Sequence, residues 1–159
     1  MGQQITLSLG WSAIYNGVDT DVNSLMDTPC KLVVWHDSLA CGICEVSRMF
    51  KWDELVADVD SMSQWFSIIF LFTPPEKDMH ILTTTLKDAR FNYPVFIDQN
   101  ATFVEQNQKL PKNSLLHTFL LDKNNKVVLV GSPLHNPVLW ELYKSTIWKM
   151  IENDGVLPE

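Results

Sequence analysis

The chain has 159 residues, of which 46% are hydrophobic and 19% are charged, so it is long enough to bury one sizeable core and too short for two ordinary domains. Nineteen acidic residues against twelve basic ones give a formal charge of −7, which repels phosphate backbones and anionic membrane surfaces and argues against a nucleic-acid partner. The longest strongly apolar run, at residues 65–72, is too short to span a bilayer, and no charged-then-apolar signal pattern opens the chain. We therefore expect one domain over residues 1–159, either soluble or the trimmed form of an exported protein.

The first buried strand is predicted at residues 31–36, after a lead-in over residues 1–30 that we expect to cover the core. The stretch "KLVVWH" is rich in β-branched and aromatic residues, which is typical of a buried strand. A helix is predicted after it, because one helical face would carry Val46, Met49, Phe50, Val56 and Val59. Between the two stands "CGIC", so Cys41 and Cys44 lie where a strand ends and a helix begins.

A second buried strand is predicted at residues 65–72, and the "TPPE" that follows it indicates a helix start. Thr73 is expected to cap this helix, with Pro74 in its first turn and Glu76 completing a capping box. We expect the helix to run to about Ala89.

The next segment is predicted to hold a short strand at 93–98 and a helical stretch at 101–108. Two further strands, "HTFLLD" and "KVVLVG", are separated only by "KNN". Such a short connection predicts a hairpin with a tight turn, in which Asn124 or Asn125 takes the left-handed conformation.

The last helix is predicted to start at "HNP", with Asn136 as the cap and Pro137 as the first residue. We expect it to end near Gly155. Its apolar stripe is formed by Trp140, Tyr143, Ile147 and Met150.

Strands that alternate with helices predict an α/β fold with a mainly parallel central sheet covered on both faces, to which the closing hairpin adds an antiparallel edge. In such sheets functional groups gather at the carboxyl ends of the strands. The cysteine pair lies at such an end.

The two neighbouring cysteines suit redox chemistry. Unpaired N–H groups and the helix dipole at a helix N-terminus stabilise a thiolate, so Cys41 is the expected nucleophile. Cys44, one helical turn further on, is close enough to attack a mixed disulfide on Cys41 and release the partner. Two alternatives remain open. The first is that both cysteines are ordinary buried thiols, as free cysteines often are. The second is a structural zinc site, which would need four ligands, whereas the four histidines show no ligand spacing. We expect no metal and no cofactor.

At this point the chain resembles thioredoxin-like proteins, and more closely the envelope thiol-disulfide oxidoreductases of the TlpA/ResA type in their Bacteroidetes-like form. The resemblance covers residues 31–152. It rests on "KLVVWH" leading into "CGIC", on "YPVFIDQNATFVEQ" as an inserted strand-helix unit, and on "HTFLLDKNNKVVLVG" as the C-terminal hairpin before the last helix. It implies disulfide exchange with protein partners in the periplasm or cell envelope, with the cytoplasm as the alternative location.

Three residues near the pair depart from the family pattern. Leu116 stands where the family has a cis-proline that faces the cysteines, and a non-proline cis bond costs about 2.5–4 kcal/mol, so we expect a trans bond there. Ala40 replaces a frequent tryptophan, and Trp35 replaces the buried acid of thioredoxins. The resemblance therefore implies a changed substrate groove lined by Ala40, Leu115 and Leu116, and a pair less shielded from metals.

His117 is a candidate proton acceptor, because a neutral imidazole on the neighbouring strand could take up a proton from a thiol. The alternative is a histidine that is merely packed or exposed. His36 and Asp37 are expected to serve the loop, Glu45 to stabilise the helix, and Cys30 to be a structural thiol.

The leading hypothesis is a monomeric thiol-disulfide oxidoreductase that acts on protein dithiols and disulfides through Cys41 and Cys44. The competing hypothesis is a thioredoxin-fold binding module with weak or no catalysis, because the usual neighbours of the pair are replaced. A peroxidase of the peroxiredoxin type is less favoured, since Val34 stands where its motif requires proline. A metal-binding protein is the last alternative.

Overall fold

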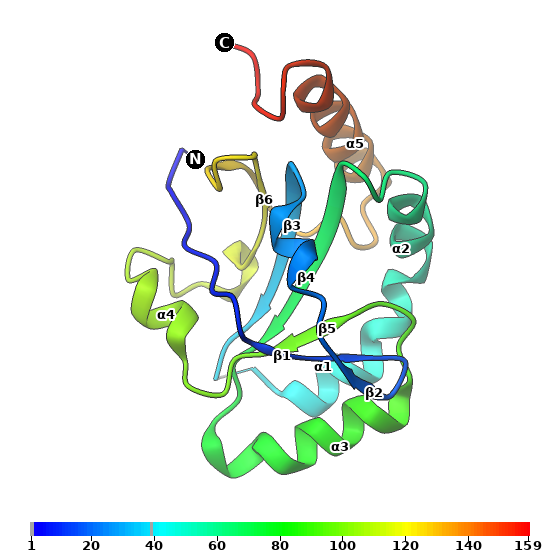
Figure 1. Cartoon of the computed structure of the whole chain (residues 1–159), viewed down its shortest axis with the longest axis vertical. Helices are drawn as coiled ribbons and strands as arrows, with labels where there is room; N and C mark the ends of the chain where they lie inside the picture. Colours follow the sequence, from blue (N-terminus) through cyan, green and yellow to red (C-terminus); the bar gives the residue numbers. More distant parts are fainter. Residues whose placement is uncertain (1, 39) are drawn as a thin grey trace.

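The computed structural model of the chain describes residues 2–38 and 40–159 and joins seven strands in one sheet, in the order β2-β1-β5-β4-β3-β6-β7 (Figure 1). The strands are β1 (Ser12–Tyr15), β2 (Val18–Thr20), β3 (Cys30–His36), β4 (Phe66–Phe72), β5 (Val95–Ile97), β6 (Thr118–Leu121) and β7 (Val127–Val130). The α-helices are α1 (Gly42–Arg48), α2 (Asp53–Asp60), α3 (Met79–Ala89), α4 (Thr102–Gln106) and α5 (Pro137–Glu152). Short 3₁₀ helices are η1 (Asn23–Asp27), η2 (Met49–Trp52), η3 (Glu76–Asp78) and η4 (Ser114–Leu116).

The centre of the sheet is parallel, as the alternation of strands and helices predicted. β4 pairs in parallel with both β3 and β5, whereas β6 runs antiparallel to β3 and pairs with β7 in the closing hairpin. Asn125 takes the left-handed conformation in the hairpin turn, with φ of 60°. The predicted strands and hairpin are therefore confirmed. The chain that leads to the cysteines leaves the carboxyl end of β3, in the middle of the sheet.

The lead-in segment contributes two strands that the sequence did not reveal. β1 and β2 form a hairpin, with Asn16 and Gly17 at positive φ in its turn, and β1 also pairs antiparallel with β5. The rest of the segment packs on the core, with Ile5 and Trp11 buried. Residues 2–30 thus both extend the sheet and cover part of it.

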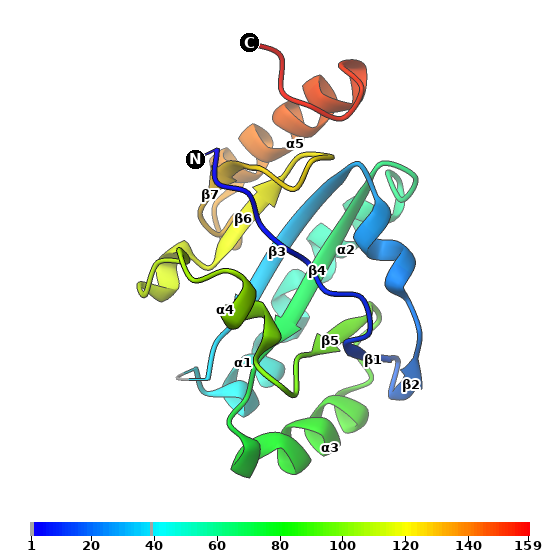
Figure 2. The ribbon, with the colours of Figure 1, turned by 60° about the vertical axis from the view of Figure 1, so that its left-hand side comes forward.

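The two faces of the sheet carry separate apolar cores, because successive residues of a strand point to opposite sides. Along β3, Leu32 and Val34 belong to the core beneath α1, α2, α3 and α5. Val33 and Trp35 belong to the other core, beneath α4 and the N-terminal chain. Figure 2 shows the N-terminal chain crossing this second face. The prediction of a sheet covered on both faces is confirmed.

Helix α5 follows its predicted start and stripe. The Asn136 side-chain oxygen accepts a hydrogen bond from the Leu139 backbone N–H at 3.1 Å, and Pro137 is the first helical residue. The helix ends at Glu152, three residues before Gly155. The predicted stripe is buried, namely Trp140, Tyr143, Ile147 and Met150.

Two helix details were predicted wrongly. Thr73 caps no helix: it is buried, and its hydroxyl accepts a hydrogen bond from the Trp35 indole nitrogen at 3.1 Å. The two prolines that follow keep the chain extended, so α3 begins only at Met79, after η3. Phe50 is 64% exposed rather than buried, because η2 interrupts the helix there and its tighter turn changes the face on which each side chain falls.

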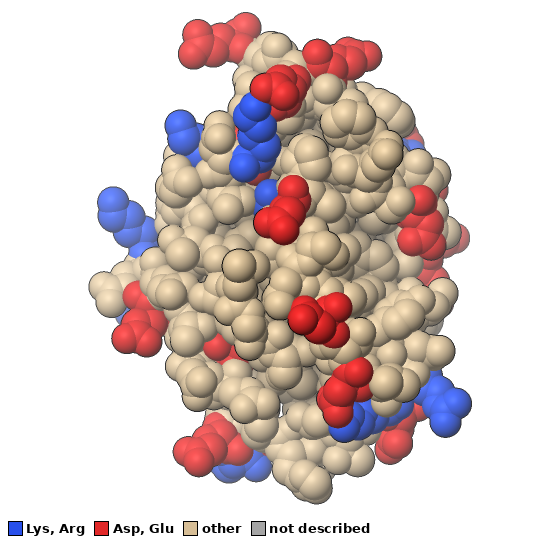
Figure 3. All heavy atoms as spheres, viewed as in Figure 1, with Lys and Arg blue, Asp and Glu red and all other residues tan. Residues whose placement is uncertain are grey.

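Acidic and basic side chains are interspersed on the face shown in Figure 3, and the Lys and Arg side chains drawn there lie mainly near its edges. That face therefore offers no broad basic patch to a phosphate backbone. Within residues 2–38 and 40–159, no helix combines the length and apolar character that crossing a bilayer requires.

Cys30 gives a prediction for the pH dependence of stability. Burial raises the pKa of this thiol from 9.0 to about 11, although the neighbouring Lys31 partly opposes the shift. Between these values the unfolded chain loses the thiol proton while the folded chain keeps it, so the folded state loses stability as pH rises. We expect this group to cost roughly 2 kcal/mol by pH 11.

The measurement is urea unfolding of the wild type and Cys30→Ala at pH 8 and pH 11. The variant has lower stability at pH 8, because it leaves a small cavity, but it lacks the thiol contribution to the decline. The wild type should therefore lose stability more steeply than the variant. Parallel losses in the two proteins would contradict this role of Cys30.

Candidate active site

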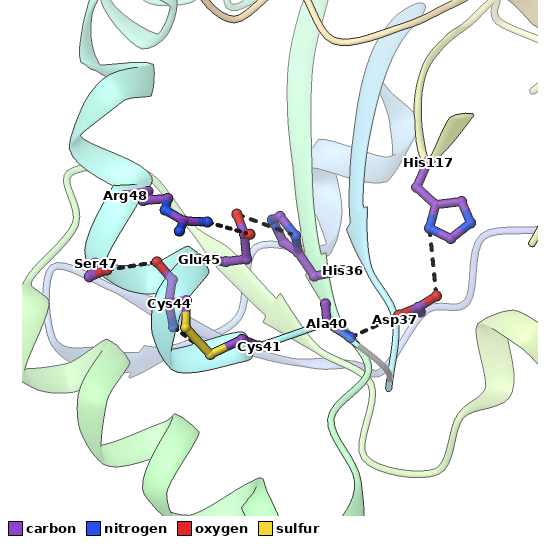
Figure 4. Close-up of polar contacts among 9 residues, drawn as sticks. All are labelled: His36, Asp37, Ala40, Cys41, Cys44, Glu45, Ser47, Arg48 and His117. Carbon is purple, nitrogen blue, oxygen red and sulfur yellow. Dashed lines mark hydrogen bonds and ion pairs between the residues drawn. A yellow bond between two sulfur atoms is a disulfide. The ribbon is translucent and has the colours of Figure 1, made fainter. Parts of the chain in front are cut away.

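Cys41 and Cys44 lie at the start of α1 and form a disulfide, with their Cα atoms 5.2 Å apart (Figure 4). Cys41 is the N-cap residue, and its sulfur accepts a hydrogen bond from the Cys44 backbone N–H at 3.3 Å. Cys41 is exposed, whereas Cys44 is only partly exposed. Cys41 is therefore the more accessible residue of the pair.

Close packing of α1 against α3 holds the pair in place. Gly42, between the two cysteines, lies so near Leu82 that a Cβ atom added there would stand 3.1 Å from a Leu82 methyl carbon. That distance is tighter than most van der Waals contacts, so the Leu82 side chain would have to shift by a few tenths of an ångström to admit a larger residue at this position. The Ser47 hydroxyl adds a 2.7 Å hydrogen bond to the Cys44 carbonyl oxygen.

Glu45 links the cysteine helix to the end of β3. One of its carboxylate oxygens lies 3.3 Å from the Arg48 guanidinium, and the other lies 3.9 Å from Nδ1 of His36 (Figure 4). The His36 ring packs on Phe72, with 4.6 Å between centroids. Burial lowers the pKa of His36, and the charge of Glu45 opposes that shift only in part. A largely neutral imidazole therefore stands beside a carboxylate near the pair.

We predicted a loop role for His36 and a role in helix stability for Glu45, and the contact between their side chains was not predicted. The usable signal was that His36 is the last residue of a strand leading to the cysteines and Glu45 directly follows Cys44. A helix that starts close to the end of the strand brings these two positions near each other.

His117 lies on the far side of Asp37 from the disulfide (Figure 4). It is buried, and its Nε2 atom is 2.8 Å from the Pro111 carbonyl oxygen, so Nε2 carries a hydrogen and donates it. Nδ1 faces an Asp37 carboxylate oxygen at 3.8 Å, and the other oxygen of Asp37 accepts a hydrogen bond from the Ala40 N–H at 3.0 Å. His117 thus reaches the loop before Cys41 through Asp37, and its ring contacts no sulfur in this arrangement.

Two hollows flank the loop before the pair, and His36, Asp37 and Ala40 line both of them. The smaller one, of about 120 Å³, contains Cys41 and is otherwise lined mainly by apolar side chains. The larger one, of about 420 Å³, lies toward β6 and also exposes Trp35, Glu45, Lys112, Ser114, His117 and Thr118.

The three residues predicted to line a substrate groove are not brought together. Ala40 lines the hollow beside Cys41, but Leu116 lines a separate cavity of about 360 Å³ together with Ile5 and Phe119. Leu115 is 77% exposed. Both leucines lie on η4, and the described residues contain no cis peptide bond, as predicted for Leu116.

Trp35 fills the place of the expected buried acid with an aromatic cluster. Its ring lies 5.3 Å from that of Phe103 and 4.2 Å from that of His117.

Cys30, at the opposite end of β3, lies about 20 Å from the carboxyl end of that strand, since each residue advances a strand by about 3.3 Å. No three His, Cys, Asp or Glu side chains of the described ranges gather closely enough to hold a metal ion.

No protein-family model matches the chain, and no curated protein matches it in sequence. Solved structures do match it. A candidate thiol:disulfide interchange protein DsbE from Chlorobium tepidum is 14% identical, with a TM-score of 0.54, over 86% of this chain and 92% of its own. A thioredoxin-like protein in its oxidized form is 12% identical, with a TM-score of 0.52, over 89% of this chain and 92% of its own. The Xanthomonas campestris bacterioferritin comigratory protein, studied for alkyl peroxide reduction, is 12% identical, with a TM-score of 0.53, over 87% and 93%. The predicted thioredoxin-like fold is confirmed.

Proposed function

We propose that the chain is a thiol-disulfide oxidoreductase that exchanges disulfides with protein partners through Cys41 and Cys44. The observation that carries the proposal is the disulfide itself, formed at a helix N-terminus between one exposed and one partly exposed cysteine. A pair placed in this way can be attacked from solvent at one sulfur and closed again by the other.

In the direction that starts from this oxidised state, a partner thiolate attacks the Cys41 sulfur. The bond between Cys41 and Cys44 breaks, Cys44 leaves as a thiolate, and a mixed disulfide joins the partner to Cys41. A second partner thiolate then attacks the partner sulfur of that bond and releases Cys41. The partner is oxidised by two electrons, and the pair takes up two electrons and two protons. The reverse sequence reduces a partner disulfide.

The groups that can take up or supply these protons lie beside the loop rather than where thioredoxins have an acid. His36 lines the hollow that contains Cys41, and Glu45 lies close to His36. We propose that this couple replaces the missing acid, because its largely neutral imidazole can accept a proton while the carboxylate stabilises the resulting charge.

We further propose a TlpA/ResA-type role, as a monomer, on protein dithiols and disulfides in the bacterial envelope. The support is the combination of the "CGIC" pair with the inserted unit of β5 and α4 before the closing hairpin. The DsbE-like neighbour agrees with such a role.

A binding module with little catalysis is the second candidate function. It is favoured by Leu115 and Leu116, which are exposed on η4 where a catalytic groove would hold proline. Peroxide reduction has less support, since Val34 lies inside β3 and pairs with β4 and β6 rather than standing in a loop. Peroxide consumption by the reduced protein, measured beside disulfide exchange, separates this activity from the proposed one.

The reactivity of reduced Cys41 tests the proposal directly. The helix N-terminus and the hydrogen bond from the Cys44 N–H both favour a thiolate at Cys41. We expect the rate of alkylation of Cys41 to rise with pH around a midpoint below about 8.5, the value of an unperturbed thiol. The measurement is mass-resolved alkylation of the reduced protein between pH 5 and pH 10. A midpoint at or above 8.5 would favour the binding module.

A further inference from the structure

The small hollow beside Cys41 has the size and lining of a pocket for one side chain. Its floor is formed by Phe72 and Leu82, which are each only 1% exposed, and its rim by Ile43, Pro74 and Pro75. These residues come from β4, α1, α3 and the loop after β4, so the pocket lies where all four elements meet. Cys41 forms part of the same lining.

The walls of this pocket are rigid. Proline fixes its own φ, and two consecutive prolines make one wall. The floor is well packed, because Phe72 and Leu82 are buried and α1 lies close to Leu82 at Gly42. Binding to a preformed pocket costs little free energy for ordering the protein. More of the free energy gained by burying an apolar side chain therefore contributes to affinity.

The volume of the pocket and the charges around it limit which side chain can enter. The volume of about 120 Å³ is below the roughly 150 Å³ of a protein cavity known to hold benzene, so an aliphatic side chain fits better than an aromatic ring. Asp37 and Asp78 also line the hollow, and the chain carries a charge of −7, so an acidic side chain would be repelled.

We infer that this pocket receives an aliphatic residue, such as valine or leucine, that neighbours the reactive cysteine of a protein partner. The inference rests on the proposed function, because the pocket adjoins the sulfur that a partner would attack or that would attack a partner. The inference makes Ile43 a specificity-determining residue. Ile43 lies between the two cysteines in sequence, and its half-exposed side chain lines the pocket.

The test uses the full chain with Cys44→Ser, reduced, and short peptides in which one cysteine is joined through a disulfide to a coloured aromatic thiol. The Cys41 thiolate attacks the peptide sulfur, a Cys41–peptide disulfide forms, and the aromatic thiolate leaves and is followed by its absorbance. The residue beside the peptide cysteine is varied among glycine, valine, leucine, phenylalanine and aspartate, on either side. We expect valine or leucine to react about tenfold faster than glycine, and aspartate to react slowest.

Ile43→Ala and Ile81→Ala form a matched pair, because the two isoleucines are 42% and 50% exposed and only Ile43 lines the pocket. Ile43→Ala should lower the leucine-to-glycine rate ratio at least threefold, while Ile81→Ala should leave it unchanged. Equal rates for all peptides, or equal effects of the two variants, would overturn the inference and leave the proposed function standing. A chain that releases no aromatic thiol beyond a Cys41→Ser, Cys44→Ser control would instead overturn the proposed function, and this inference with it.

Discussion

Cys41→Ser is expected to lower disulfide exchange at least about 10³-fold, because a serine hydroxyl cannot replace a thiolate as nucleophile or form the disulfide. Cys44→Ser should behave differently. It keeps the attacking sulfur but removes the group that closes the internal bond, so the partner should remain attached to Cys41. The measurement is turnover of a protein disulfide with dithiothreitol as the electron donor, together with non-reducing electrophoresis to detect the trapped partner.

Cys30→Ala is the matched control for both variants. It removes a third thiol that is buried at the far end of β3, so it should leave turnover near the wild-type rate. A Cys41→Ser variant that keeps more than a tenth of the activity would refute the assignment of the nucleophile. A Cys44→Ser variant that traps no partner while Cys41 remains reactive would refute the resolving role.

Trp35→Ala is expected to lower the free energy of unfolding by about 3–5 kcal/mol, the range for large aromatic residues removed from a core. Trp35 is 6% exposed, and its indole nitrogen donates to Thr73. Its removal leaves a cavity against Phe103 and deprives the buried Thr73 hydroxyl of its donor. Since a domain of this size has about 5–15 kcal/mol in total, the variant should unfold at a much lower urea concentration.

Trp148→Ala makes the same chemical change at a site that is 50% exposed on α5, and it should cost at most about 1 kcal/mol. Equal losses in the two variants would show that Trp35 does not anchor this core. Trp35→Phe keeps an aromatic side chain but removes the indole N–H and part of the ring volume. Its loss of stability should lie between those of Trp148→Ala and Trp35→Ala, because it combines a smaller cavity with the loss of the hydrogen bond to Thr73.

Local signals explain which parts of the fold could be predicted. β3 and β4 are runs of buried residues, and α5 carries an N-cap residue, a proline in its first turn and an apolar stripe. A short stretch of sequence is therefore enough to predict each of these elements. The position of the cysteines could be predicted from the end of β3, because the pair lies between that strand and the helix that follows it.

The missed features depend on partners far away in the chain. β1 has four residues and β2 has three, and β1 is fixed by pairing with β5, about 80 residues later. No local pattern reveals such a pairing. The same holds for Thr73, whose hydroxyl is used by Trp35 of a neighbouring strand rather than by the helix that follows. At the site, the distance between Glu45 and His36 depends on how α1 folds back on β3.

The first residues that the structure describes also protect the sheet. Gly2 donates its N–H to the Val127 carbonyl oxygen, Val127 donates to that of Gln3, and Ile5 donates to that of Asn125. The start of β7 therefore finds its hydrogen-bond partners within its own chain. An exposed edge strand invites pairing with a second molecule and, from there, aggregation. A chain shortened by its first five residues should consequently be more prone to self-association, even though the cysteine site lies elsewhere in the molecule.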